Sequence, residues 1–232
     1  GGRGITGAAN GGTLTIKNNT IKGNKGGVRF DCCTNSSAVF QIQANTIENN
    51  VVSGNTGDGA GIYIDAIPND ATITITDNII KGNTATGPYA ATGNGGGIWL
   101  LRGKIVAISN NTIVENAASG DGAGIYIMQV GTSTVTANII KGNTATGNGG
   151  GIFVYQVTPI VISDNTIVEN AAGDTGGGLY FNIYSGSSNH DVVHNVVAFN
   201  SAKRGSGMAI LDGNPYPTGL ITVKKNTIHG NV

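Results

Sequence analysis

The stretch at residues 78–87 reads NIIKGNTATG, and the same ten residues return at 138–147. Between and after these copies, NTIVENAA occurs at 111–118 and again at 165–172. All four stretches begin with the pattern N-x-[I/V]-x-x-N, in which two asparagines flank one branched apolar residue. Self-similarity at a period of roughly 20–50 residues is typical of chains built from stacked repeats. The alternation of the two versions indicates a two-repeat unit duplicated in tandem.

The pattern runs through the whole chain. It occurs eight times, at successive spacings of 26, 33, 33, 27, 27, 30 and 31 residues, with its first asparagine at Asn19, Asn45, Asn78, Asn111, Asn138, Asn165, Asn195 and Asn226. A second motif, Gly-x-Gly followed by an apolar residue, falls between these copies and begins at Gly59, Gly95, Gly122, Gly149, Gly176 and Gly205. We therefore expect residues 1–232 to form one repeat-built domain.

Each period contains three short runs in which apolar and polar residues alternate, the pattern of a strand with one buried face. The first run follows the glycines (62–64, IYI), the second precedes the first asparagine (73–75, ITI), and the third holds the Ile or Val between the asparagines, as at Ile113. No segment has the periodicity of a crossover helix. These runs predict an all-β chain that coils on itself, with about eight coils and three parallel sheets, each strand pairing with its equivalent one coil later.

The repeated polar residues have physical reasons in such a coil. Asparagine tolerates the left-handed backbone that a tight corner needs, and stacked amides can hydrogen-bond from coil to coil. Gly-x-Gly permits a sharp turn into the next strand. We therefore expect asparagines at the corners in the left-handed conformation, with their amides forming a ladder.

Composition excludes several classes of protein. Glycine makes up 39 of 232 residues and charged residues only 11%, which does not suit a helical bundle. The net charge is zero, and the 13 basic and 13 acidic residues are scattered along the chain, so we expect no basic stripe for binding nucleic acid. No apolar run is long enough to cross a bilayer.

Two motifs carry a family resemblance. The stretches GGGIWL at 95–100 and NTIVEN at 111–116 resemble the repeat of right-handed parallel β-helix proteins of the pectate-lyase-like superfamily. The combination of glycines with N-x-I-x-x-N looks closest to repeats in bacterial surface adhesins and polymorphic outer-membrane proteins. The resemblance covers about residues 5–231 and implies a right-handed β-helix in an extracellular or cell-surface protein. This architecture carries enzymes and inert stalks alike, so the resemblance does not select one function.

One column of aromatic residues is predicted on the outside of the coil. If Ile62 and Ile64 point inward, the residue between them points outward, because side chains alternate along a strand. The same register gives an outward aromatic column of Tyr63, Trp99, Tyr126, Phe153 and Tyr180. A contiguous exposed apolar patch usually marks a contact site, so the column predicts binding of a polysaccharide or of a neighbouring protein surface. Two alternatives stay open: the rings only stabilise the sheet, or a loop covers them.

The polar residues beside this column suggest a competing function. The outward charges on the same sheet are Arg29, Asp31, Asp65 and Arg102. The resemblance implies that enzymes of the superfamily work with acids and a basic residue on this sheet, so a polysaccharide lyase or glycoside hydrolase is the alternative. Asp31 and Asp65 fall on adjacent coils and could share calcium, but calcium takes about six to eight ligands. We therefore expect neither a resident cofactor nor a metal site, and no catalytic residue is assigned.

Three further sets of residues have ordinary structural explanations. Asp58, Asp121 and Asp174 precede the glycine turns in equivalent places, where Asp is a usual turn residue and a row of weak cation sites is the alternative. His190 and His194 are expected to line the coil or a loop rather than bind metal. For the adjacent Cys32 and Cys33, two free thiols and a vicinal or intermolecular disulfide remain equally open.

The sequence shows no polar capping segment at either end. We therefore expect either a fragment of a longer surface protein or a unit that associates end to end into a filament. Together these patterns predict a non-catalytic extracellular β-helical module with a structural or adhesive role.

Overall fold

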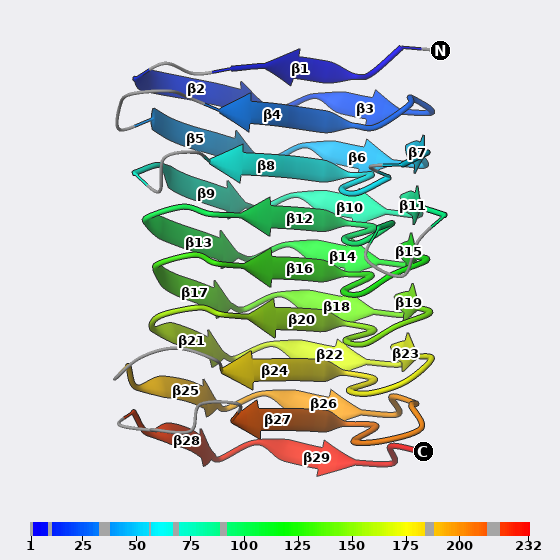
Figure 1. The fold of residues 1–232 in the computed structure, drawn as a ribbon, viewed down its shortest axis with the longest axis vertical. Coiled ribbons are helices and arrows are strands. Elements are labelled where there is room, and N and C mark those ends of the chain that lie inside the picture. Colours follow the sequence, from blue (N-terminus) through cyan, green and yellow to red (C-terminus); the bar gives the residue numbers. More distant parts are fainter. Residues whose placement is uncertain are drawn as a thin grey trace.

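A computed structural model describes residues 2–8, 11–32, 38–55, 57–66, 70–88, 92–183, 188–212 and 219–232. Within these ranges the chain forms strands β1 to β29 and no helix. The strands stack along one long axis, with the N-terminus and the C-terminus at opposite ends (Figure 1). All pairings are parallel, and each strand pairs with its equivalents in the coils above and below, as predicted.

Three sheets contain eight strands each, which corresponds to seven full turns between the first strand and the last. The first sheet contains β1 (Ile5–Gly7), β4 (Val28–Cys32), β8 (Ile62–Ala66), β12 (Ile98–Leu101), β16 (Ile125–Met128), β20 (Ile152–Tyr155), β24 (Leu179–Ile183) and β27 (Met208–Asp212). The second sheet contains β2 (Gly12–Lys17), β5 (Ala38–Gln43), β9 (Thr72–Thr76), β13 (Ile105–Ser109), β17 (Thr132–Thr136), β21 (Ile160–Ser163), β25 (His190–Val193) and β28 (Ile221–Lys224). The third sheet contains β3 (Thr20–Lys22), β6 (Thr46–Glu48), β10 (Ile79–Lys81), β14 (Thr112–Val114), β18 (Ile139–Lys141), β22 (Thr166–Val168), β26 (Val196–Ala198) and β29 (Thr227–His229).

A fourth, five-stranded sheet was not predicted. It contains β7 (Val51–Ser53), β11 (Thr84–Thr86), β15 (Ala117–Ala118), β19 (Thr144–Ala145) and β23 (Ala171–Ala172). Its strands are two or three residues long and consist mostly of small side chains, so they carry no alternating pattern to recognise. The segment that begins at Thr84 therefore starts with a strand, β11.

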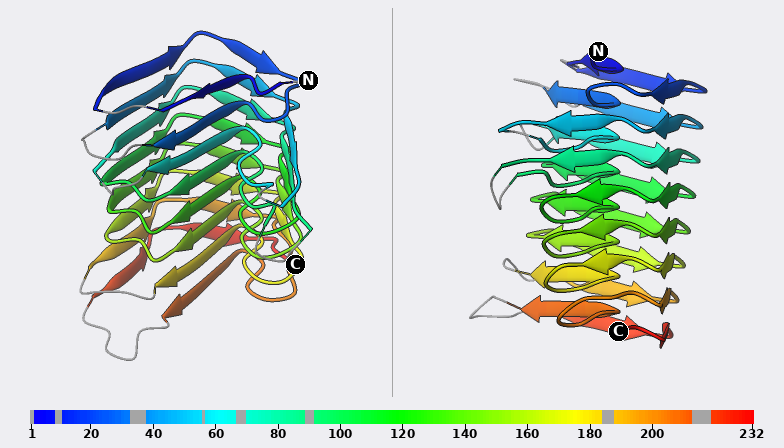
Figure 2. Two further views of the ribbon diagram at one scale, coloured as in Figure 1. Left: turned by 45° about the horizontal axis from the view of Figure 1, so that its top comes forward. Right: turned by 90° about the vertical axis from the view of Figure 1, so that its right-hand side faces the viewer.

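The core lies where the periodicity places it. The isoleucines of the third sheet pair in register from coil to coil, as in Ile80 with Ile113 and Ile113 with Ile140, and all three are fully buried. Burying a side chain of this size contributes roughly 1.5–3 kcal/mol. The coils enclose one apolar core. The tilted view on the left of Figure 2 shows how the coils stack on one another around it.

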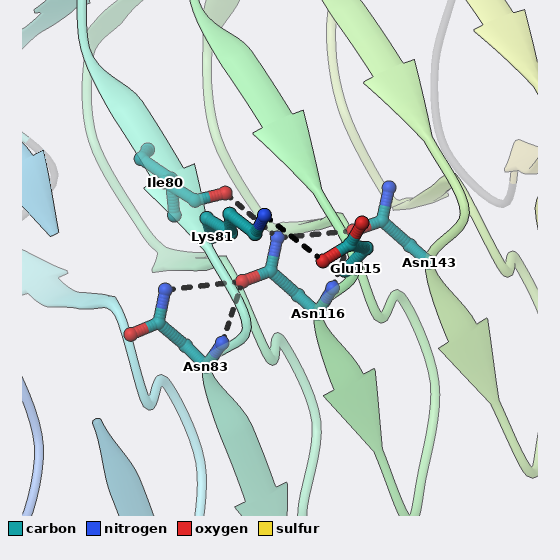
Figure 3. A network of polar contacts seen from close by, with 6 residues as sticks. All are labelled: Ile80, Lys81, Asn83, Glu115, Asn116 and Asn143. Atoms are coloured by element: carbon teal, nitrogen blue, oxygen red, sulfur yellow. Dashed lines mark hydrogen bonds and ion pairs between the residues drawn. The ribbon is translucent and has the colours of Figure 1, made fainter. Parts of the chain in front are cut away.

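Two asparagine ladders flank the third sheet, one from each asparagine of the repeat. In the second ladder the side-chain amide and backbone N–H of Asn83 both donate to Oδ1 of Asn116, at 3.0 and 2.9 Å. The Asn116 amide donates in turn to Oδ1 of Asn143 and to the carbonyl of Ile80, each at 3.0 Å (Figure 3). Buried asparagines are thereby satisfied by the coils on either side, as the predicted ladder requires.

The prediction that the ladder asparagines themselves adopt the left-handed conformation was wrong. The residue before each ladder asparagine carries the positive φ, such as Asp77 (58°) before Asn78 and Glu115 (55°) before Asn116. The corner therefore lies one position earlier than expected. This shift leaves the asparagine in ordinary geometry, with its amide directed along the axis.

Candidate functional site: the outer face of the first sheet

The aromatic column has the predicted register. Tyr63 pairs with Trp99, Trp99 with Tyr126, Tyr126 with Phe153, and Phe153 with Tyr180. The rings stack almost parallel, at interplanar angles of 4–5°, with centroid separations of 4.2, 6.1, 4.8 and 5.0 Å along the column. The parallel strands thus hold five rings in one continuous stack, which we call the aromatic stack.

The expectation that this column is exposed was wrong. Tyr63, Trp99, Tyr126 and Phe153 retain only 6–8% of their accessible surface, and Tyr180 is half-buried. Neighbouring rings cover each other's faces, so no flat platform is presented to a ligand.

The glycine turns provide the second cover. Gly95 has φ 63°, and a Cβ placed there would lie 2.6 Å from Cβ of Trp99. Gly59 has the same relation to Tyr63, at 2.6 Å, and Gly149 to Phe153, at 2.8 Å. Each turn therefore folds over the first outward residue of its strand. The two alternatives to a contact platform, a stabilising stack and a covering loop, both describe what is observed.

The next outward column is more accessible. Leu101, Met128 and Tyr155 lie two residues beyond the stack, further from the glycine turns, and are partly exposed while packing against the rings. The same register predicted them to face outward, but they were not assigned to the binding site. Distance from the glycine turn was the signal that separates the two columns.

The four charged residues of the predicted cleft form two ion pairs. Arg29 binds both carboxylate oxygens of Asp31 at 2.8 Å, and its guanidinium lies 3.7 Å from the ring centroid of Tyr63, so it covers one end of the stack. Arg102 binds Asp65 of the preceding coil, with contacts of 2.6, 2.7 and 2.9 Å. The structure therefore brings these residues together in pairs, with each acid bound to an arginine.

Burial shifts the pKa values of three side chains on this face. It raises the pKa of Tyr63 to about 12, against the opposing effect of Arg29, and it raises the pKa of Tyr126 as well. For Arg29, burial lowers the pKa, but the contacts with Asp31 and Tyr63 outweigh this and leave it raised. The phenols and the guanidinium thus keep their ordinary protonation states at neutral pH.

Two of the three turn aspartates belong to a third polar ladder, which the sequence did not reveal. The backbone N–H of Asn94 donates to Asp58 (2.7 Å), that of Asp121 to Asn94 (2.8 Å), and that of Asn148 to Asp121 (2.6 Å). Burial raises the pKa of both Asp58 and Asp121. The prediction that Asp174 occupies the place of Asp58 and Asp121 was wrong. That place, directly before the left-handed Gly176, is taken by Thr175. Asp174 instead pairs with Arg204 at 2.8 Å.

The histidines have the structural positions expected of them. His190 is buried in the second sheet and packs edge-on against Phe181, with ring centroids 5.3 Å apart. His194 occupies a left-handed corner with φ 58°. Among the described residues, no three of His, Cys, Asp and Glu come together as a metal site. Cys33 and the side chain of Cys32 lie outside the described residues.

No helix in the described part of the chain is long and apolar enough to span a membrane. A family model described as "Right handed beta helix region" matches residues 3–173 and 92–232. The comparisons with curated proteins and with solved structures gave no match. With its four parallel sheets, its asparagine ladders and a family match over nearly its whole length, the chain belongs to the right-handed β-helix family.

Proposed function

We propose that this chain is a non-catalytic structural or adhesive module of an exported, cell-surface protein. The observation that carries the proposal is the pairing of polar groups on the outer face of the first sheet. Both oxygens of Asp31 and both oxygens of Asp65 already accept hydrogen bonds from arginines. Side chains so engaged stabilise the face and leave little chemistry available.

Catalysis would need a free base or acid next to the substrate. The oxygens of a carboxylate that accepts guanidinium hydrogen bonds at 2.6–2.9 Å are engaged and are screened from a substrate proton. The same argument disfavours a calcium ion between Asp31 and Asp65, because its ligand oxygens would have to leave their arginines. These contacts support a structural role over a lyase or hydrolase.

In its adhesive role, the module contacts a polysaccharide or a neighbouring protein surface. The accessible apolar residues on this face are Leu101, Met128 and Tyr155, and the aromatic stack beneath them acts as rigid support. A row of partly exposed apolar side chains on a stiff sheet suits a contact surface.

Incubation with acidic and neutral polysaccharides, with and without calcium, separates the two functions. We expect retention of the chain on one or more polysaccharides and no release of new reducing ends. Release that disappears in Asp65→Asn would overturn the proposal in favour of an enzyme.

Tyr155→Ala and Trp99→Ala test which column makes the contact. We expect Tyr155→Ala to weaken retention with only a small loss of stability, because this ring is partly exposed. Trp99→Ala lowers stability by roughly 3–5 kcal/mol because a buried ring is removed. Thr74→Ala, on the second sheet, is the control and should change neither. Full retention in Tyr155→Ala would remove this column from the proposal.

A further inference from the structure

The fourth sheet has a free edge at β7 (Val51–Ser53). Every other strand of this sheet lies below an equivalent strand of the preceding coil, whereas β7 pairs with β11 on one side and with no strand on the other within the described ranges. The cause is a difference in coil length. Three residues, 25–27, separate Asn24 from Val28, whereas eleven residues, 51–61, separate Asn50 from Ile62. The earlier coil therefore runs directly from the third sheet to the first sheet. It has no strand in the fourth sheet, so the position next to β7 is vacant.

Backbone groups of Val51 and Ser53 face this vacancy, and those of Ser53 are unpaired within the described ranges. The N–H of Val51 donates to the carbonyl of Asn24 at 2.9 Å, so Val51 directs its backbone groups toward the earlier coil. Because these directions alternate along a strand, the N–H and C=O of Ser53 point the same way. In later coils the equivalent N–H groups, of Ser119, Thr146 and Gly173, donate to the coil above at 2.9–3.0 Å. No such partner is present for Ser53 among the described residues.

A cationic cavity of about 370 Å³ lies beside this edge. Its wall includes all of β7 together with the cations Arg3, Lys25 and Arg29 and the acid Asp58. Arg29 is already bound to Asp31, and Asp58 accepts the N–H of Asn94. Arg3 and Lys25 form no ion pair with any described residue, so their charges remain to be matched.

We propose that the free edge of β7 binds an extended acidic peptide segment of a partner protein. The segment adds as a further strand of the fourth sheet, with its backbone paired to Ser53 and to the carbonyl of Val51, whose N–H already donates to Asn24. A carboxylate side chain then lies against Arg3 and Lys25. This site is separate from the contact column of the first sheet and does not depend on it.

Strand addition suits the observed geometry. Backbone hydrogen bonds to an exposed sheet edge give affinity, and side-chain pockets give specificity. The cavity has the volume of a small ligand site, and Val51 and Val52 are part of its wall. A three-residue edge offers few hydrogen bonds, so the charges contribute a large share and binding weakens with salt.

Fluorescence anisotropy with a labelled peptide, acetyl-Val-Asp-Thr-Asp-Val-amide, tests the proposal on the full chain. A second peptide replaces both acids by asparagine. Two more carry N-methyl groups on alternate residues, in the two possible phases, so that one of them blocks the paired edge. We expect the acidic peptide to bind, and both the neutral peptide and one methylated peptide to bind roughly tenfold more weakly.

Protein variants separate charge from pairing. Arg3→Gln with Lys25→Gln should weaken binding roughly tenfold, whereas Lys104→Gln with Lys203→Gln, equally exposed cations elsewhere, should not. Ser53→Pro removes the N–H that faces the vacancy, and proline is tolerated on an edge strand at such a position. We expect Ser53→Pro to melt at an unchanged temperature and to lose the peptide.

Three outcomes would overturn the proposal. If both methylated peptides bind as well as the parent peptide, the cavity holds an anion by charge alone. If free acetate competes as strongly as the peptide, the ligand is a small carboxylate. No binding of the acidic peptide at about 1 mM would exclude the site. Should Ser53→Pro fail to fold, the methylated peptides still decide the question.

Discussion

A half-buried aspartate and a buried histidine affect stability in opposite directions as the pH changes. The aspartate is Asp121. Burial raises its pKa above 3.8, so the folded chain binds this proton more tightly than the unfolded chain. Its effect on stability therefore becomes unfavourable as the pH rises from about 3.8 through the raised pKa. Asn94 and Asn148 occupy the equivalent places without a charge.

We therefore expect Asp121→Asn to raise the melting temperature at pH 7, with the gain disappearing at about pH 3. Asparagine keeps an oxygen that can accept the N–H of Asn148. The control is Asp174→Asn, which removes an exposed ion pair with Arg204 and should bring no gain. A lower melting temperature of Asp121→Asn at pH 7 would show that the charge itself is required.

The second side chain is His190, for which the sign reverses. Burial lowers its pKa, while the adjacent Asp191 acts to raise it, and neither ring nitrogen has a hydrogen-bond partner in the described structure. The unfolded chain binds the proton more tightly, so stability falls as the pH drops below 6.5. We expect His190→Leu to reduce this acid sensitivity in urea unfolding between about pH 7.5 and 5. His194→Asn replaces an exposed histidine at a corner and is the control. Its stability should depend on pH as that of the wild type does.

For single residues, the sequence predicted the register of side chains in the sheet better than their burial or their partners. The register of Tyr63 and Trp99 followed from alternation alone, because a strand has a fixed period of two. Their burial did not follow, because it depends on a turn folding back over the strand and on ring faces closing on one another. The alternation of apolar and polar residues along a strand does not indicate whether a turn covers its outward side chains. The pairing of Asp65 with Arg102 was equally unpredictable, since it spans 37 positions in the chain.

Among the larger elements, the asparagine ladders dominate the polar energetics. Asn116→Ala would remove the hydrogen bonds of this side chain to the N–H and amide of Asn83 and to the carbonyl of Ile80. The Asn83 amide keeps its bond to the carbonyl of Ile47, but the buried N–H of Asn83 is left without a partner. An unsatisfied buried group costs about 1–3 kcal/mol, and each further lost hydrogen bond about 0.5–1.5 kcal/mol. We expect a loss of roughly 3 kcal/mol or more in the free energy of unfolding, measured by urea titration.

Two exposed contacts provide matched controls. The amides of Gln129 and Gln156 also hydrogen-bond between coils, at 3.1 Å, but on the surface. The Lys81–Glu115 ion pair, beside the ladder in Figure 3, is about half exposed on the lysine and more on the glutamate. Gln129→Ala and Lys81→Ala should each cost less than about 1 kcal/mol. A comparable loss in Asn116→Ala and Gln129→Ala would contradict the buried-ladder explanation.

Sheets differed in how far they could be predicted. The first three sheets have an apolar residue at alternate positions and an asparagine or glycine at a fixed place beside them, so both strand and register were readable. The strands of the fourth sheet, such as Ala117–Ala118, consist of small residues that are compatible with a turn. Tertiary stacking on β11, rather than intrinsic preference, makes them strands. For the same reason the free edge of β7 could not be foreseen.

At the scale of the whole molecule, each described strand pairs only with its equivalents in the adjoining coils. Stability in such an array is approximately a sum of coil terms and nearest-neighbour interfaces, so a local defect need not unfold the whole chain. The coil that contains β28 and β29 exposes residues of the inward columns, with Val223 at 47% and Ile228 at 50%. Equivalent residues in the middle coils, such as Ile113, are fully buried.

Hydrogen exchange on the 232-residue chain should therefore follow the axis. We expect peptides that cover β28 and β29 to exchange first and those that cover β13 and β14 to exchange last, because the middle coils are sandwiched on both sides. Ile113→Ala removes a buried side chain at a cost of about 2–5 kcal/mol, and we expect it to speed exchange in its own coil and in the two adjoining coils, β10 and β18 included. Thr74→Ala, on the outside of the second sheet, should leave exchange unchanged. If Ile113→Ala accelerated every coil equally, the chain would unfold as one cooperative unit, and the nearest-neighbour description of its stability would be wrong.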